Sequence, residues 1–200
     1  MPCVTNDAGR VVKLYDLYGR GSPYTELVRD PRILDPMESL LGPNIVLTRY
    51  RHNLGTVNAP GDNPTRLHRD VLQWSRTIVT ALLYLDESTV DNGSTLLIPG
   101  SHFLPYVGTP NNGGTWMDEH HVFAQWMEKA IPVPMPVGSM LFFDSTVFHT
   151  VGKNNTDGLR ASVIFGYHSV DELEEELPPS KILVRGENLY RGNDLRFRSK

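Results

Sequence analysis

The sequence has few cysteines, no long apolar run and no excess of positive charge, and each shortage excludes a class of protein. Cys3 is the only cysteine among the 200 residues, so an internal disulfide is excluded and a reducing compartment suits the chain. No apolar run reaches the roughly 18 residues that a membrane helix needs. Residues 1–10 also lack the apolar centre of a signal peptide. We therefore expect a cytoplasmic protein without a membrane partner.

The charge balance argues against nucleic acid as a partner. The formal net charge is −4, whereas non-specific binding to nucleic acid depends on clustered lysine and arginine. Hydrophobic residues make up 40% of the chain and charged residues 21%, a composition typical of a globular protein rather than a disordered one. A chain of this length suits one domain, so residues 1–200 are expected to form a single folded unit.

The first part of the chain is interpreted as a helical lead-in, residues 1–43. The pattern predicts short helices at Tyr24–Arg29 and Pro31–Leu41, the second ended by Gly42-Pro43. A strand is expected at Asn44–Tyr50. The segment His52–Pro64 is rich in Asn, Gly and Pro, which predicts a loop.

The rest of the chain is dominated by short strands between turns, with residues 44–170 as the core and 171–200 as a covering segment. A helix is expected at Trp116–Ala130, and the prolines of Val133–Val137 permit only an edge strand or a lead-in. This pattern favours an all-β double sheet or barrel with helices packed outside. The expected strands are Thr77–Leu85, Ser94–Ile98, Ser139–Phe143, Thr146–Val151 and Leu159–Tyr167.

Two histidines and one aspartate form a candidate metal site. His68 and Asp70 are two residues apart, so on an extended segment both face one side while Arg69 points away. His149 would arrive from another strand. Two imidazoles and one carboxylate on one face of an ion are typical of non-haem Fe(II) oxygenases. Taken alone, an H-x-D triplet is a weak signal, and a single His68 is more often a surface residue.

An arginine and a serine follow at a spacing that strengthens the metal interpretation. Arg160 and Ser162 lie two apart on one predicted strand and so face one side. A guanidinium makes a paired contact with a carboxylate and stays charged at cellular pH. A structural salt bridge is the alternative role for Arg160, but an arginine within an apolar strand needs an anionic partner in either case.

Three segments together resemble the phytanoyl-CoA dioxygenase family of Fe(II)- and 2-oxoglutarate-dependent oxygenases. They are LHRDVLQW at 67–74, DNGSTLLIPGSH at 91–102 and GSMLFFDSTVFHTVGKN at 138–154. The resemblance covers about residues 40 to 170. It implies a mainly β fold with flanking helices around a double-stranded β-helix core, the jelly-roll of the cupins.

The resemblance also implies roles for the site residues. His68, Asp70 and His149 would bind Fe(II) as the catalytic centre, while Arg160 with Ser162 would bind the distal carboxylate of the co-substrate 2-oxoglutarate. The implied reaction uses O2 to oxidise a substrate C–H bond and releases succinate and CO2, with ascorbate as an in vitro reductant. Halogenating relatives replace the carboxylate by a small residue, so Asp70 favours hydroxylation, desaturation or ring formation.

Other residues are weaker candidates. Trp74 matches an aromatic that lies beside the substrate in some relatives, although a core role is equally compatible, and Tyr50 is a second candidate substrate contact. Asn92-Gly93 and Pro99-Gly100-Ser101 match turn positions of the family. His120-His121, within the unmatched segment 105–132, could suggest a second metal site, but an exposed histidine pair is the preferred interpretation.

Alternatives to this function stay open at the level of the sequence. A cupin-like dioxygenase or isomerase would use the metal without 2-oxoglutarate, and a jelly-roll binding module would not be catalytic. Nucleic-acid demethylation is disfavoured, because the sequence shows no basic patch that would bind nucleic acid. We expect a small-molecule substrate, such as an amino acid or a natural-product intermediate, since no cluster of Lys and Arg provides an acyl-CoA platform. The family usually has a longer N-terminal region, which is compatible with a homodimer that completes the pocket.

Overall fold

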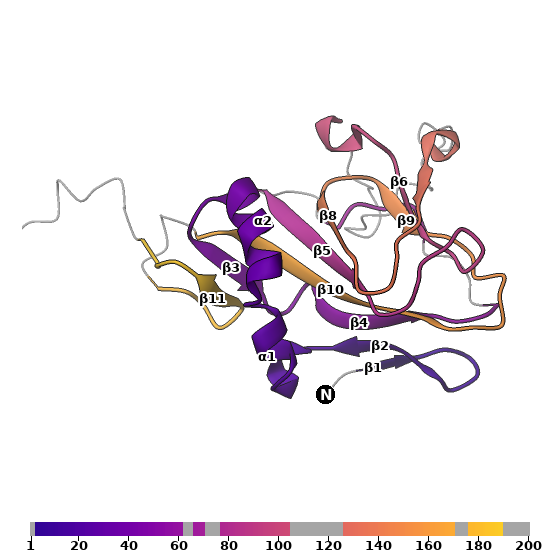
Figure 1. Cartoon of the computed structure of the whole chain (residues 1–200), viewed down its shortest axis with the longest axis horizontal. Helices are drawn as coiled ribbons and strands as arrows, with labels where there is room; N and C mark the ends of the chain where they lie inside the picture. Colours follow the sequence, from indigo (N-terminus) through magenta and orange to yellow (C-terminus); the bar gives the residue numbers. More distant parts are fainter. Residues whose placement is uncertain (1–2, 62–65, 71–76, 105–125, 171–175, 190–200) are drawn as a thin grey trace, which may run out of the picture.

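The structure is a computed structural model, and it describes residues 3–61, 66–70, 77–104, 126–170 and 176–189. Within these ranges the chain is mainly β, with antiparallel strands that curl around each other and two helices packed on one side (Figure 1). This arrangement confirms the predicted double-stranded β-helix core. The domain boundaries at 43 and 170 stay a prediction.

Most of the described strands belong to one larger sheet. Its hydrogen-bonded order is β1-β2-β4-β10-β3-β11, while β5 pairs with both β10 and β8. These strands are β1 Cys3–Thr5, β2 Val11–Tyr15, β3 Ile45–Thr48, β4 Asn53–Asn58, β5 Ile78–Tyr84, β8 Met140–Asp144, β10 Arg160–Ser169 and β11 Lys181–Arg185.

A smaller sheet has the order β7-β6-β9. It consists of β7 Ile131–Val133, β6 Thr95–Leu97 and β9 His149–Val151, and β6 is antiparallel to both neighbours. β7 is an edge strand of this sheet, which agrees with the edge position expected from the prolines that follow it. Short 3₁₀ turns at Tyr18–Arg20 (η1), Ser101–Phe103 (η2) and Met127–Lys129 (η3) connect the elements.

Helix α2, Pro31–Leu41, forms where the sequence predicts it and covers part of the larger sheet. The Asp30 carboxylate caps the helix by accepting a hydrogen bond from the backbone N–H of Arg32 at 2.8 Å. Gly42, with φ of 85°, ends it. The helix buries Ile33, Leu34 and Met37. Helix α1, Tyr24–Leu27, precedes it.

The main core lies between these helices and the larger sheet. Burial of these side chains is the dominant stabilising contribution, about 1.5–3 kcal/mol for each large one. β5 is buried on both faces, as its continuous apolar sequence predicts. The core includes Leu17, Val28, Met37, Ile45, Leu47, Ala81, Phe165 and Tyr167.

Two predictions of local structure are wrong. A hairpin of β1 and β2 lies within residues 3–15, part of the segment interpreted as a helical lead-in. The tail, for which no strand was predicted, contains β11, which pairs with β3. The predicted loop at His52–Pro64 contains β4, although its sequence NLGTVN has little apolar alternation. β4 forms because both of its edges pair, with β10 and with β2, and such tertiary pairing overrides weak local propensity.

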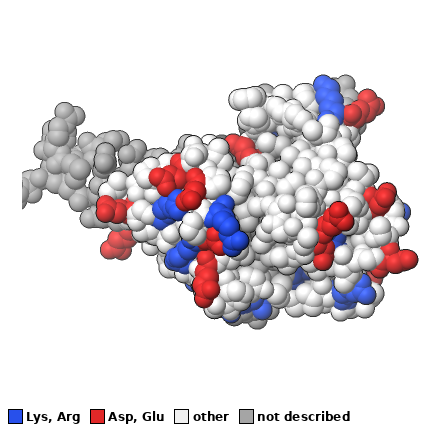
Figure 2. Space-filling view, viewed as in Figure 1, with Lys and Arg blue, Asp and Glu red and all other residues white. Residues whose placement is uncertain are grey.

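The surface carries charges of both signs close together. On the face shown in Figure 2, acidic and basic side chains are interspersed and no continuous basic patch is seen among the coloured residues. Arg185 on β11 illustrates the pattern, since it pairs with Asp35 at 2.7 Å and Glu38 at 2.8 Å on α2. Within the described ranges, no helix has both the length and the apolar character needed to cross a membrane.

Candidate metal centre

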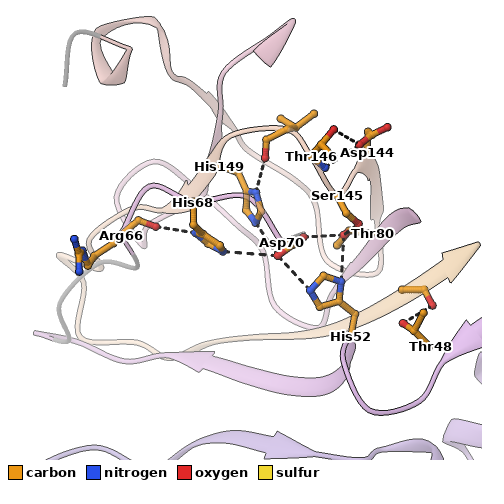
Figure 3. Close-up of polar contacts among 12 residues, drawn as sticks. Thr48, His52, Arg66, His68, Asp70, Thr80, Asp144, Ser145, Thr146 and His149 are labelled. Carbon is orange, nitrogen blue, oxygen red and sulfur yellow. Dashed lines mark hydrogen bonds and ion pairs between the residues drawn. The ribbon is translucent and has the colours of Figure 1, made fainter. Parts of the chain in front are cut away.

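His68, Asp70 and His149 converge on one point at the end of a cavity (Figure 3). One potential ligand atom from each residue lies within 4.8 Å of the other two. The Nε2 atoms of His68 and His149 are 3.7 and 3.5 Å from Oδ1 of Asp70. The structure therefore brings together three side chains that the sequence singled out, in an arrangement that fits one ion.

Backbone hydrogen bonds fix the relative position of these three residues. His68 and His149 form an isolated antiparallel bridge, in which the N–H of each donates to the carbonyl of the other at 3.0 and 2.9 Å. The N–H of Asp70 donates to the carbonyl of Ser145 at 2.9 Å. The two segments are thus joined before any side chain contacts a metal.

Both histidines direct the same ring nitrogen toward Asp70. Nδ1 of His68 lies 2.7 Å from the carbonyl oxygen of Arg66, and Nδ1 of His149 lies 2.9 Å from that of Val147. A carbonyl only accepts, so each Nδ1 carries a hydrogen and Nε2 of the neutral ring presents its lone pair. This is the tautomer that a metal-binding imidazole needs.

The electrostatics of the site favour a neutral His68 and an ionised Asp70. Burial, reinforced by the charge of His149, lowers the pKa of His68 to about 4. For Asp70, burial alone would raise the pKa, but His149, His52 and His68 outweigh it and hold that pKa below the usual value. A neutral imidazole and an ionised carboxylate are the forms in which these two groups coordinate a cation.

Residues that sequence reasoning missed hold the Asp70 carboxylate. The hydroxyl of Thr80 on β5 donates to Oδ2 at 2.9 Å and lies 2.8 Å from the hydroxyl of Ser145. Nε2 of His52 lies 3.2 Å from Oδ1. Thr80 could have been noticed as a polar residue within an apolar, fully buried strand, since such a group requires a partner. His52 gave no signal, because it fell in the predicted loop.

Arg160 and Ser162 lie side by side on β10 and line the same cavity as the three candidate ligands. Both are buried, with 3% exposure each. The Ser162 hydroxyl lies 2.9 Å from that of Thr56 on β4. The Arg160 guanidinium lies 5.8 Å from the Tyr84 ring centre, and its buried Nε has no hydrogen-bond partner among the described residues.

Burial lowers the pKa of Arg160, while nearby Tyr84 and Asp86 oppose the shift. A guanidinium nevertheless stays charged in a protein. A buried cation with an unused N–H donor is costly unless an anion pairs with it. The end of the cavity around Arg160 therefore fits a carboxylate or a similar anion.

The cavity that these residues share has a volume of about 310 Å³. Apolar side chains, among them Leu54, Leu82 and Ile164, line it together with the polar residues described above. Lys13 on β2 also lines it. Lys13 pairs in register with Thr56, which pairs with Ser162, so the three residues form one row across neighbouring strands.

Arg69 points away from the cluster, as the alternation predicts. Its guanidinium donates to the carbonyl oxygens of Ser101 and Leu104 at 2.8 and 3.0 Å, and it lies 4.2 Å from the Phe148 ring centre. The Ser101 hydroxyl accepts the N–H of Phe148 at 2.7 Å. The motif Pro99-Gly100-Ser101 thus holds the segment that ends in His149.

The Asn92-Gly93 turn has a comparable structural role. Gly93 has a φ of 79°, and a Cβ there would lie 2.2 Å from the carbonyl oxygen of Gly152. The Asn58 amide donates to the carbonyl oxygens of Asn92 and Gly152 at 3.2 and 3.1 Å. Only glycine permits this close approach, which joins the end of β4 to the segment after β9.

Of the remaining sequence candidates, Tyr50 is the one that the described ranges include, and it is not among the residues that line the cavity. Tyr50 is 67% exposed and lies on the surface against Arg49, with the guanidinium 5.4 Å from the ring centre. A contact between Tyr50 and the substrate stays a prediction. Trp74, His120 and His121 lie outside the described residues, as does most of the helix predicted at Trp116–Ala130.

Comparison with known protein families shows which family this chain belongs to. The family model of phytanoyl-CoA dioxygenase (PhyH) matches residues 22–162, well over half of the sequence. The chain belongs to the phytanoyl-CoA dioxygenase family. The matched range contains every candidate metal ligand together with Arg160 and Ser162, whereas the β1–β2 hairpin that carries Lys13 lies before it.

Curated relatives of this PhyH-family chain include oxygenases of small molecules. It is 26% identical over 171 residues to dioxygenase af480 of Aspergillus fumigatus, covering 81% of this chain and 50% of that protein. It is 27% identical over 183 residues to the ectoine dioxygenase of Bordetella bronchiseptica, covering 78% and 55%. The chain spans about half the length of these curated relatives.

Solved structures support the PhyH-type fold. The epimerase SnoN, in complex with Fe3+, alpha ketoglutarate and nogalamycin RO, superposes with a TM-score of 0.69 at 24% identity, covering 84% of this chain and 68% of that one. EctD from S. alaskensis with 2-oxoglutarate and 5-hydroxyectoine also gives 0.69, at 22% identity and covering 84% and 60%. At these identities the likeness is one of fold.

Proposed function

We propose that this chain is an Fe(II)- and 2-oxoglutarate-dependent oxygenase that oxidises a C–H bond of a small molecule and releases succinate and CO2. One observation carries the proposal. A three-ligand cluster of two imidazoles and a carboxylate shares a single cavity with a buried arginine whose Nε has no described hydrogen-bond partner. Family membership and the activities of the curated relatives support it.

The donor set fits ferrous iron. His68, Asp70 and His149 would hold the metal on one side, which leaves positions open toward the cavity, as in the facial triad of non-haem iron oxygenases. When bound, the iron would supply the activation of O2. The backbone bridge between His68 and His149 would keep the two imidazoles in place during turnover.

Arg160 would bind the distal carboxylate of 2-oxoglutarate. The guanidinium offers paired donors that match a carboxylate, and an anion would satisfy the buried charge that the described residues leave without a hydrogen bond at Nε. Ser162, one position along the same face, would donate its hydroxyl to the same oxygens. The apolar side chains of the cavity lining would exclude water from the co-substrate.

Asp70 favours hydroxylation, or a related desaturation or cyclisation, over halogenation. A carboxylate at this position occupies the coordination site that a halide would need. The relatives named as ectoine dioxygenase and as a probable alpha-ketoglutarate-dependent hypophosphite dioxygenase act on small molecules. Lys13 at the cavity wall favours a substrate with an acidic group, such as an amino acid or a carboxylated natural-product intermediate.

The test is succinate release by the Fe(II)-loaded protein with 2-oxoglutarate and ascorbate, screened over such substrates. We expect substrate-dependent succinate in the native protein and none above background in Asp70→Ala. The matched control is Asp7→Ala, which alters an exposed acidic residue outside the described cavity lining. Asp70→Ala protein that oxidises the substrate at the normal rate would rule out the ligand assignment.

The alternative functions fit the site less well. A cupin-like dioxygenase or isomerase that does not use 2-oxoglutarate would have no use for the buried Arg160 in the cavity. A non-catalytic jelly-roll module would not need three ligands in the correct tautomers. A cytoplasmic location and a homodimer are compatible with the proposal and stay predictions.

A further inference from the structure

A third imidazole, His52, lies at the metal centre but outside the group of three candidate ligands (Figure 3). Its side chain is 12% exposed and lines the cavity just before β4. Nε2 of His52 lies 3.2 Å from Oδ1 of Asp70, and Nδ1 lies 3.4 Å from the Thr80 hydroxyl. His52 is therefore in direct contact with the carboxylate through the oxygen that faces the other two imidazoles.

The protons available around Asp70 determine which groups donate and which accept in this hydrogen-bond network. Asp70 only accepts when ionised, so the single Thr80 proton is used at Oδ2 and the Ser145 hydroxyl donates to Thr80. The 3.2 Å contact at Oδ1 requires a donor, which Nε2–H of His52 provides. The 3.4 Å contact at Nδ1 is too long to be a strong hydrogen bond.

The two hydrogen bonds act on different oxygens of one carboxylate. Thr80 on β5 contacts Oδ2, and the neighbouring His52 contacts Oδ1. With Oδ2 already engaged, Oδ1 is the oxygen left to bind a metal, as a monodentate ligand. The rotation of the carboxylate about its Cβ–Cγ bond is then set by Thr80 and His52 together.

The backbone around His52 is built to hold it close to β10. The carbonyl of His52 accepts the N–H of Gly166 at 2.8 Å, and the Thr48 hydroxyl donates to the carbonyl of Gly166 at 3.1 Å. A Cβ on Gly166 would lie 2.9 Å from Cβ of His52 and 2.6 Å from Oγ1 of Thr48. Glycine at this position is what lets the imidazole approach Asp70.

We propose that His52 is a positioning residue, which donates Nε2–H to Oδ1 of Asp70 and orients that oxygen for the metal without itself binding the metal. The proposal rests on the proposed function, since it takes the triad to be the iron site. Hydrogen-bond partners of ligands usually contribute about 10- to 100-fold to metal affinity. Replacing His52 should therefore weaken the metal site while leaving its three ligands in the chain.

The experiment measures Co(II) affinity of the metal-free full chain by titration, with Co(II) as a spectroscopic stand-in for Fe(II). His52→Leu removes the donor, and we expect its dissociation constant to rise about 10- to 100-fold. His52→Gln places an amide N–H near the position of Nε2, so it should recover most of the affinity. Both variants should give the native visible Co(II) spectrum at saturation, since the ligand set is unchanged.

Two outcomes would overturn the role of His52. Equal Co(II) affinity in the native protein and His52→Leu would show that the contact does not position Asp70. A loss that His52→Gln does not recover, with a changed Co(II) spectrum, would make His52 a direct ligand. If His52→Leu does not fold, His52→Asn replaces it, because the shorter side chain cannot place its amide at Nε2.

The same titration separates failure of this inference from failure of the proposed function. A native protein that does not bind Co(II) would contradict the iron site itself. A native protein that binds Co(II), and whose Fe(II) form binds 2-oxoglutarate, supports the proposed function whatever the His52 variants do. Only the difference between native protein, His52→Leu and His52→Gln bears on the positioning role.

Discussion

His68 and His149 exchange two backbone hydrogen bonds, of 3.0 and 2.9 Å, although they come from distant parts of the chain. Their rings lie 4.3 Å apart, centre to centre, and both Nε2 atoms approach the same oxygen of Asp70. The bridge means that backbone hydrogen bonds of the fold hold the two imidazoles close together. A preformed site of this kind reduces the ordering cost of binding an ion.

Replacing Arg160 by lysine should weaken 2-oxoglutarate binding specifically. Lysine keeps the positive charge but loses the paired donors that match a carboxylate. We expect the KM for 2-oxoglutarate to rise about tenfold or more, since a hydrogen bond to a charged group is worth about 1.5–3 kcal/mol. Steady-state kinetics with each substrate varied in turn would check this. An unchanged KM for 2-oxoglutarate would contradict the assigned role.

The metal-free protein should lose stability as the pH falls from about 7 to 4. Burial lowers the pKa of His68 to about 4 in the folded state, against 6.5 for an unperturbed histidine. Between these values the unfolded chain binds a proton that the folded chain does not, so the free energy of unfolding rises with pH. Urea unfolding in the presence of a chelator would measure it.

His68→Gln is the matched variant for this pH dependence. It removes the titrating group, so its stability should change less than that of the native protein between pH 4 and pH 7. The difference is at most about 3 kcal/mol, because each unit of pKa shift corresponds to about 1.36 kcal/mol. Identical pH profiles for the two proteins would show that His68 is not the buried neutral imidazole described above.

Gly166→Ala should disturb the metal site from a distance. The added Cβ would lie 2.9 Å from Cβ of His52 and 2.6 Å from Oγ1 of Thr48, so one of them must move. We expect a loss of about 1–3 kcal/mol in the free energy of unfolding, together with weaker Co(II) binding. Gly158→Ala is the control, because its nearest contact would be 3.8 Å. Native-like Co(II) affinity in Gly166→Ala would argue against tight packing at His52.

Ser101→Ala should destabilise the segment that carries His149. The buried hydroxyl accepts the N–H of Phe148 at 2.7 Å, and its removal leaves a buried donor without a partner. The expected cost is about 1–3 kcal/mol, measured by urea unfolding. Ser22→Ala, which removes an exposed hydrogen bond to Glu26, should cost much less. Comparable effects for the two variants would contradict a clamping role for Ser101.

The sequence predicts much of the site because its elements follow simple alternation. Spacing of two residues places His68 with Asp70, and Arg160 with Ser162, and the structure has each pair in one cavity. The buried strand β5 and helix α2 are recognisable for similar reasons, since a continuous apolar run and a capped amphipathic segment are local signals.

What the sequence does not predict depends on distant pairing. β4 has weak strand character and forms between β10 and β2, so His52 was assigned to a loop and its contact with Asp70 was missed. The β1–β2 hairpin, which brings Lys13 to the cavity, is a different case, because the turn residues Asn6–Gly9 and the apolar strand Val11–Tyr15 are local signals that the helical interpretation of residues 1–43 overlooked. Tyr50 is exposed outside the described cavity lining, and its role as a substrate contact stays a prediction.

The most direct test of the account is the visible absorption of the anaerobic Fe(II)-protein when 2-oxoglutarate is added. Chelation of iron by the co-substrate gives a weak charge-transfer band, and it requires both the three-ligand site and room beside it. We expect this band in the native protein and no band in Asp70→Ala. In Arg160→Lys, a higher concentration of 2-oxoglutarate should be needed to form the band. A native protein that binds Fe(II) but gives no band would contradict the central claim and favour a metal enzyme that does not use 2-oxoglutarate.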